Sequence, residues 1–147
     1  MNWFIRIIAL CCWMAAVSLV AEEQEESAYA FRGVHFFASY SDCDPEALSD
    51  VSGLQLAMRA AVEQCGATIL DESSWVFEPN GLTMVFLLSE SHASIHTYPE
   101  HSACFVDLFT CGDKCSAEKF DEALRTYLKP KEVDKRTLIR DKSIQEK

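Results

Sequence analysis

The order of apolar and polar positions in the first half of the chain predicts a strand, a turn and a helix. Residues 33–41 (GVHFFASYS) alternate and are rich in aromatic side chains, which is typical of a strand. Residues 42–46 (DCDPE) have the composition of a turn. From Ser52 onward apolar residues recur at helical spacing. Either Ser52 or Asp50 can cap the start of this helix, and Gly66 can end it.

The second half of the chain is predicted to contain most of the strands. Four segments have strand-like composition between turn signals: 67–78, 82–88, 93–98 and 104–110. The apolar run at 82–88 does not alternate, which indicates a strand buried on both faces. Residues 116–130 carry one apolar stripe between a capping serine and a proline, so a second helix is expected there. Residues 131–141 are expected to add an edge strand.

This order of elements predicts an α+β fold. Strands that follow one another directly favour an antiparallel sheet, and the two predicted helices are expected to pack on one face of it as a two-layer sandwich. The other face of the sheet then needs a cover. A second copy of the chain is the simplest cover, so a homodimer is expected.

The N-terminal segment differs in character from the rest of the chain. It has one cation, Arg6, followed by an apolar stretch from Ile7 to Val20, which is the layout of a secretory signal peptide. This pattern favours export, with membrane attachment only if the segment stays uncleaved. The predicted parts of the chain are a signal peptide or N-terminal anchor at 1–21, an acidic linker at 22–29, a folded domain at 30–141 and a tail at 142–147.

The composition argues against nucleic acid as a partner and leaves an odd number of cysteines to account for. Lys and Arg number 13 against 23 Asp and Glu, a net charge of −10, which argues against a surface that binds nucleic acid. The chain has seven cysteines. Without Cys11 and Cys12 in the N-terminal segment five remain, so at least one thiol has no intrachain disulfide partner.

Residues 87–101 (LLSESHASIHTYPEH) hold more reactive side chains than a buried strand usually does. These side chains can simply cap turns. A zinc site is an alternative use of the histidines and cysteines, but no C-x2-C pair is present, so no metal is expected. Ser–His hydrolase chemistry lacks its G-x-S-x-G turn. The residues available to a metal are His92, His96, His101, Cys104, Cys111 and Cys115.

A more specific interpretation comes from the order of residues in 88–113, LSESHASIHTYPEHSACFVDLFTCGD. This segment resembles the processing and active-site segment of bacterial and archaeal S-adenosylmethionine decarboxylase proenzymes, which share S-E-S-H, I-H-T-W/Y-P-E and V-D-x-F-T-C-G. The resemblance extends upstream through SDCDPEALSD, CGATILDES and FEPNGLT, and covers about residues 30–140.

The resemblance implies that the chain cuts itself between Glu90 and Ser91. In such proenzymes the serine becomes a pyruvoyl group, the cofactor on which S-adenosylmethionine is decarboxylated for spermidine and other polyamines. By position, His96 assists processing and Cys111 protonates the decarboxylated carbon. Thr83 stands where the family usually has a serine that assists processing.

Two residues are implied in substrate binding: Phe77 would stack on the adenine, and Glu100 would accept the ribose hydroxyls. Packing and solvation remain the alternative roles of Phe77, Glu100 and Cys111. A second hypothesis is that the chain is a related pyruvoyl-dependent enzyme that acts on arginine or ornithine. A third is that it is an exported, catalytically silent homologue that acts as a binding module. The family works on a cytoplasmic metabolite, whereas the N-terminal segment favours export, so the compartment stays open.

Strand alternation poses a problem for these roles. It places Ser91 and His96 on opposite faces of one strand, so a bulge or bend is required if both serve one site.

Overall fold

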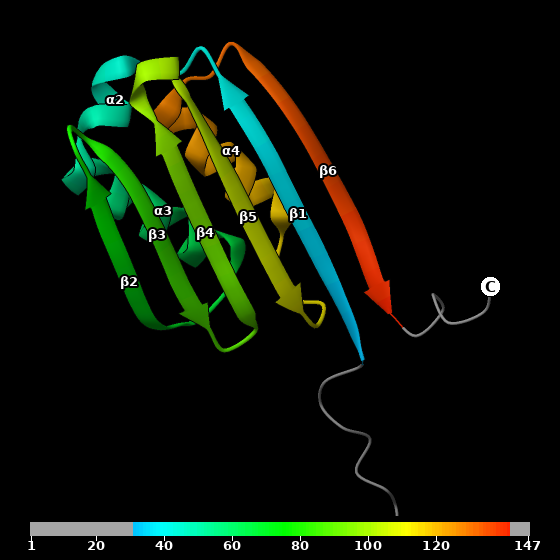
Figure 1. Ribbon diagram of the computed structural model, residues 1–147. Helices are drawn as coiled ribbons and strands as arrows, with labels where there is room; N and C mark the ends of the chain where they lie inside the picture. The colour runs from blue at the N-terminus through cyan, green and yellow to red at the C-terminus, as the bar shows by residue number, and fades with distance from the viewer. Residues whose placement is uncertain (1–30, 142–147) are drawn as a thin grey trace, which may run out of the picture.

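A six-stranded antiparallel sheet with helices on one side forms the core of the computed structural model, which describes residues 31–141 (Figure 1). The elements in chain order are β1 (Arg32–Ser41), α2 (Pro45–Ser49), α3 (Val51–Cys65), β2 (Ile69–Phe77), β3 (Gly81–Leu88), β4 (Ser91–Tyr98), the 3-10 turn η1 (Pro99–His101), β5 (Ala103–Cys111), α4 (Ala117–Leu128) and β6 (Glu132–Asp141). The strand order is β2-β3-β4-β5-β1-β6, and every neighbouring pair is antiparallel. The predicted α+β sandwich is therefore confirmed, including the edge strand β6.

The segment predicted as a turn at 42–46 instead leads into a short helix, α2, so that prediction was wrong from Pro45 onward. Oδ1 of Asp44 accepts hydrogen bonds from the backbone N–H groups of Glu46 and Ala47, at 3.0 and 3.4 Å. Pro45 takes the first helical position, where its missing N–H costs nothing. The Asp-Pro-Glu sequence at residues 44–46 therefore starts helix α2.

The two longer helices begin and end where their capping residues predict. Oδ1 of Asp50, the alternative to Ser52, accepts the Gly53 N–H at 3.0 Å and starts α3. Gly66 ends α3 in a left-handed conformation with φ of +96°. Ser116 caps α4 through a 3.3 Å bond from the Lys119 N–H.

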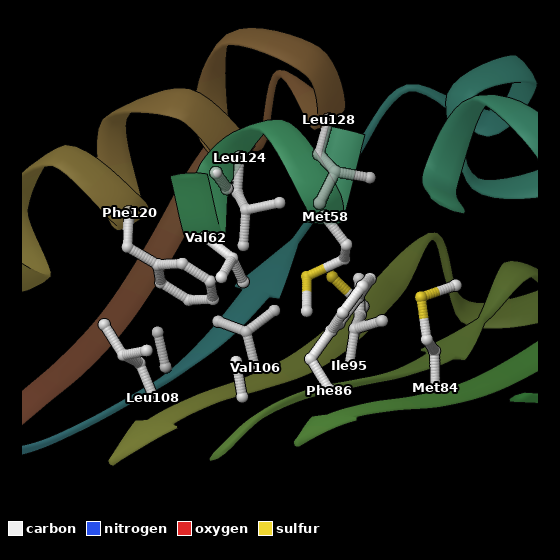
Figure 2. Close-up of a cluster of buried hydrophobic side chains, with 14 of the residues drawn as sticks. Met58, Val62, Met84, Phe86, Ile95, Val106, Leu108, Phe120, Leu124 and Leu128 are labelled. Carbon is white, nitrogen blue, oxygen red and sulfur yellow. The ribbon is translucent and has the colours of Figure 1, made fainter. Parts of the chain in front are cut away.

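The core lies between the sheet and the two long helices (Figure 2). Met58 and Val62 point down from α3, and Phe120 and Leu124 from α4, onto side chains of the central strands. Their sheet partners include Met84, Phe86, Ile95, Val106 and Leu108. This layer packs the two long helices against one face of the sheet.

The face of the sheet turned away from the helices, called here the open face, has no cover from residues 31–141. Strand β3 shows this directly, because Leu82 and Phe86 are buried whereas Val85 and Leu87 are 41% and 54% exposed. The prediction that 82–88 is buried on both faces is therefore wrong for a single chain. Its apolar residues on the open face are consistent with the expected partner subunit.

A buried carboxylate ties α4 to two strands. The Tyr40 hydroxyl donates to Oδ1 of Asp121 at 2.6 Å, and Nζ of Lys135 donates to Oδ2 at 2.6 Å. Both Tyr40 and Asp121 are almost fully buried, and burial raises the pKa of Tyr40, which keeps its hydroxyl protonated as the donor.

Asp121→Ala is expected to lower the free energy of unfolding by roughly 2–3 kcal/mol, because the Tyr40 hydroxyl then stays buried without an acceptor. Urea denaturation measures the change. Glu122→Ala is the matched control, since Glu122 is the exposed neighbour on the same helix and should change stability by less than about 0.5 kcal/mol. Equal effects from both substitutions would contradict the role given to Asp121.

The predictions for 1–21, 22–29 and 142–147 lie outside the described residues. Within 31–141, no helix is long and apolar enough to cross a membrane.

Candidate active site

The candidate residues fall into two groups at opposite ends of the strands. The serine cluster consists of Glu90, Ser91, His92 and Cys111, at the β3–β4 turn and the end of β5. The histidine cluster consists of Phe77, Thr83, His96, Tyr98 and Glu100, at the other end of β2, β3 and β4.

The Glu90–Ser91 peptide bond lies in a tight turn that is anchored on both sides. The carbonyl oxygen of Glu90 accepts the Cys111 N–H at 2.9 Å, and Oε2 of Glu90 accepts the Thr68 N–H at 2.9 Å. The Ser89 N–H in turn donates to the Thr68 carbonyl at 2.9 Å. These bonds leave the carbonyl of Glu90 polarised by a backbone donor.

Strand β4 pairs in unbroken register with both neighbouring strands, so the bend that would bring Ser91 and His96 into one site of a single chain is absent. Ser91 itself has an unusual backbone conformation. Its φ of +152° is one that a residue with a side chain rarely adopts, at a cost of about 1–3 kcal/mol. The Ser91 hydroxyl lies 3.1 Å from Nδ1 of His92 in a hydrogen bond. The His92 ring contacts the Phe109 ring on the open face, with centroids 5.9 Å apart. The serine hydroxyl therefore lies within reach of the open face.

Cys111 lies beside this turn at the end of β5. The register pairs Ser91 with Thr110, so Cys111 is the next residue along. With Phe109 and Arg140 it lines a hollow of about 420 Å³, and the Arg140 guanidinium lies 4.5 Å from the centre of the Phe109 ring. The thiol is partly exposed, so a small molecule can reach it.

In the histidine cluster, Thr83 and His96 face each other across β3 and β4. The Thr83 hydroxyl is hydrogen-bonded to Nδ1 of His96. A β-branched residue at this position thus still directs its hydroxyl at the histidine, and the bond fixes the orientation of the ring.

A cleft of about 710 Å³ opens beside His96, and Phe77, Tyr98 and Glu100 line it with the histidine. The His96 ring centre lies 6.0 Å from that of Phe77 and 4.6 Å from that of Tyr98. This volume suits a ligand the size of a nucleoside, with flat surfaces for a base and a carboxylate for hydroxyl groups. The sequence had not singled out Tyr98, although its place in the I-H-T-Y-P-E motif was a signal.

The two clusters are separate within one chain. Ser91 and His96 are five positions apart on β4, and at about 3.3 Å per residue they are roughly 16 Å apart. The structure therefore brings Ser91 together with Cys111, and brings His96 together with Thr83, Phe77 and Glu100, but leaves a gap between the two sets.

The residues considered for zinc do not converge. Within residues 31–141, no group of three or more His, Cys, Asp or Glu side chains is placed to hold a metal ion. Cys104, for example, is fully buried.

Comparison with known proteins identifies the family. A family model described as S-adenosylmethionine decarboxylase matches residues 34–141. The chain therefore belongs to the S-adenosylmethionine decarboxylase family. This confirms the resemblance inferred from the motifs, and it places the chain in a family of enzymes.

Relatives named S-adenosylmethionine decarboxylase proenzyme cover most of the folded part of the chain. That of Methanococcus aeolicus is 39% identical over 102 residues, which is 69% of this chain and 87% of the relative. That of a Synechococcus strain is 40% identical over 109 residues, covering 74% and 85%. A crystal structure of the adenosylmethionine decarboxylase from Aquifex aeolicus superposes with a TM-score of 0.71 at 33% identity, covering 80% of this chain and 98% of that one.

Proposed function

We propose that this member of the S-adenosylmethionine decarboxylase family is a self-processing, pyruvoyl-dependent enzyme. It cuts itself between Glu90 and Ser91 and converts S-adenosylmethionine to decarboxylated S-adenosylmethionine and carbon dioxide, for spermidine and other polyamines. The observation that carries this proposal is the geometry of the turn. Ser91 has a strained φ of +152°, and the Glu90 carbonyl oxygen accepts the Cys111 N–H at 2.9 Å.

Processing begins when Oγ of Ser91 adds to the Glu90 carbonyl and the peptide bond is exchanged for an ester. Negative charge builds on the carbonyl oxygen in this step, where the Cys111 N–H already donates. His96 then takes the α-proton of Ser91, the ester eliminates, and Glu90 becomes a C-terminal carboxylate. Water releases ammonia from residue 91 and leaves the ketone. Thr83, bonded to His96, keeps the ring aligned for the proton transfer.

The pyruvoyl group supplies the electron sink that decarboxylation requires. The side chains around it bind the substrate and move protons. Phe77 offers a face to the adenine and the sulfonium, and Glu100 offers acceptors to the ribose hydroxyls. Sγ of Cys111 gives a proton to the carbon that has lost its carboxyl group.

A homodimer joins the two clusters. The open face exposes apolar side chains on β2, β3 and β5, namely Trp75, Phe77, Val85, Leu87 and Phe105. A second copy laid on this face, with its strands running the opposite way, covers these side chains. It also sets the histidine cluster of one subunit against the serine cluster of the other, which the gap of roughly 16 Å within one chain demands.

The substrate proposal favours S-adenosylmethionine over arginine or ornithine. A basic side chain would need a further carboxylate in the site, and β2 offers two, Asp71 and Glu72. Glu72 faces α3, where Oε2 accepts a hydrogen bond from Arg59 at 2.5 Å. Glu72 is therefore paired on the helix side of the sheet. Asp71 pairs with Leu87 at the end of β2 far from Phe77, and it does not line the cleft.

The deciding experiment is the intact mass of the purified wild-type chain under denaturing, reducing conditions. Two fragments are expected, one ending at Glu90 and one beginning with a pyruvoyl group at position 91. A single polypeptide that persists after long incubation would contradict self-processing and favour a catalytically silent homologue. The same spectrum shows whether the first fragment begins at Met1 or near Glu22, the site that export would produce.

Phe77→Ala is expected to raise the KM for S-adenosylmethionine about tenfold, because an aromatic face on a desolvated cation contributes roughly 1–2 kcal/mol. Its cleavage at position 90–91 should proceed at the wild-type rate. Carbon dioxide release measures turnover. Val76→Ala is the matched control, because Val76 is adjacent on β2 and does not line the cleft. An unchanged KM would remove Phe77 from the binding site, and turnover of arginine or ornithine alone would reverse the substrate assignment.

A further inference from the structure

Five cysteines lie within residues 31–141, and four of them form two contacting pairs. The Cys43 and Cys104 side chains share a hydrogen bond in the core, and so do those of Cys65 and Cys115. In this structure all of them are thiols. Cys111 belongs to neither pair.

The backbone holds the first pair together. The Cys43 N–H donates to the carbonyl oxygen of Ser102 at 2.9 Å. Ser102 is two residues before Cys104, which lies on β5. Cys104 lies opposite Tyr40 in the β1–β5 register, close to the start of the loop that carries Cys43. Both side chains are almost fully buried.

The second pair joins the end of α3 to the start of α4. The Ser116 N–H donates to the Cys65 carbonyl at 2.8 Å, so Cys115 is held directly beside Cys65. Glu90 acts electrostatically on both thiols, which places this pair behind the β3–β4 turn. Cys65 is buried, whereas Cys115 is partly exposed.

Each pair has one member before and one member after the Glu90–Ser91 junction. We propose that Cys43–Cys104 and Cys65–Cys115 become disulfide bonds that hold the two halves of the cleaved chain together. The tethering role rests on the proposed self-cleavage, but the disulfides themselves do not. The pairing also accounts for the odd number of cysteines, since it leaves Cys111 as the thiol that donates a proton.

Each bond forms by thiol–disulfide exchange with a small disulfide such as oxidised glutathione. One cysteine thiolate attacks the oxidant, and the second cysteine displaces the mixed disulfide. Two S–H bonds are lost and one S–S bond is gained, while two electrons and two protons reduce the oxidant to two thiols.

The chain must form these bonds largely while it folds. Burial raises the pKa of Cys115 to about 11, so little reactive thiolate is present in the folded chain at neutral pH. Cys43 and Cys104 are out of reach of an oxidant once the core has packed.

The test is to refold the full, reduced chain in a buffer of reduced and oxidised glutathione, alkylate the remaining thiols and map the peptides without reduction. Two linked peptides are expected, joining 43 to 104 and 65 to 115, with the alkyl group on Cys111. Alkylation of all five thiols, or linkage through Cys111, would overturn the proposal.

Gels of the same sample separate this proposal from the proposed function. One band without reductant and two bands with it are expected. Linked peptides in a chain that remains one band after reduction would support the disulfides and contradict self-cleavage. Two bands without reductant would contradict the tether and support self-cleavage.

Thermal unfolding supplies an independent measurement in the uncut Ser91→Ala background. Reductant is expected to lower the Tm of the Ser91→Ala chain by about 10 °C more than that of a Ser91→Ala chain that also carries Cys65→Ser and Cys115→Ser. The reason is that the Cys65–Cys115 disulfide closes a long loop and so restricts the unfolded state. An equal fall in both chains would show that the second pair carries no disulfide.

Discussion

Ser91→Ala and His96→Ala chains are each expected to stay uncut when purified alone, and to recover cleavage when refolded together. The first variant lacks the hydroxyl that attacks the Glu90 carbonyl. The second has the hydroxyl but no histidine to take the α-proton, so it should stall as the ester, which hydroxylamine splits. Both losses are expected to be complete on the time scale of wild-type processing.

Recovery in the mixture follows from the gap between the two clusters. A mixed dimer pairs the Ser91 of the His96→Ala chain with the His96 of the Ser91→Ala chain, so one site is intact. Random pairing makes half of the dimers mixed, and about half of the His96→Ala chains are then expected to be cut. A tag on that chain, followed by mass spectrometry, identifies the fragments.

The control is a mixture of Ser91→Ala with the double variant Ser91→Ala/His96→Ala, which contains no Ser91 and should remain intact. Light scattering confirms that subunits have paired. Mixed dimers without cleavage would show that the site is not shared between subunits. Cleavage of His96→Ala alone at the wild-type rate would remove the histidine from processing.

Local signals were enough to predict most of the fold. The caps Asp50, Gly66 and Ser116 lie at the helix ends they predict. Alternation located β1, and strand-like composition between turn signals located the other strands. Within residues 31–141, the α-helix that was missed is α2, which is too short for a periodic pattern and is marked only by its Asp-Pro start. The open face was missed at 82–88 because an apolar run looks the same whether its second face meets the core or another subunit.

The sequence named the candidate residues one by one, but it did not show how the fold arranges them. The motifs place Ser91, His96 and Cys111 close together in sequence order, whereas on the strands only Ser91 and Cys111 are neighbours. The φ of +152° at Ser91 has no sequence signature, because glycine would be the usual residue there. Spatial relations between strands, and between subunits, depend on register that one sequence does not display.

Cys111→Ala is expected to leave self-cleavage in place and to lower turnover about 10²- to 10⁴-fold, the usual contribution of a positioned acid. The distinction has a structural reason. Processing uses the backbone N–H of Cys111, which donates to the Glu90 carbonyl at 2.9 Å and survives the substitution. Turnover uses the thiol, which alanine lacks.

Two measurements on one sample check this prediction. The mass of the C-terminal fragment reports cleavage, and carbon dioxide release from S-adenosylmethionine reports turnover. Without the thiol, a proton is expected to reach the cofactor carbon instead, so that alanine slowly replaces the pyruvoyl group at residue 91 and the enzyme inactivates itself. Cys115→Ala is the matched control when both chains are assayed in reductant, which removes the proposed Cys65–Cys115 disulfide from the comparison. Cys115 is partly exposed and lies outside the hollow that Cys111 lines. The Cys115→Ala chain should keep both cleavage and turnover, because no step of the reaction uses that thiol. Full turnover in Cys111→Ala would refute the proton-donor role and leave Cys111 with its backbone hydrogen bond alone.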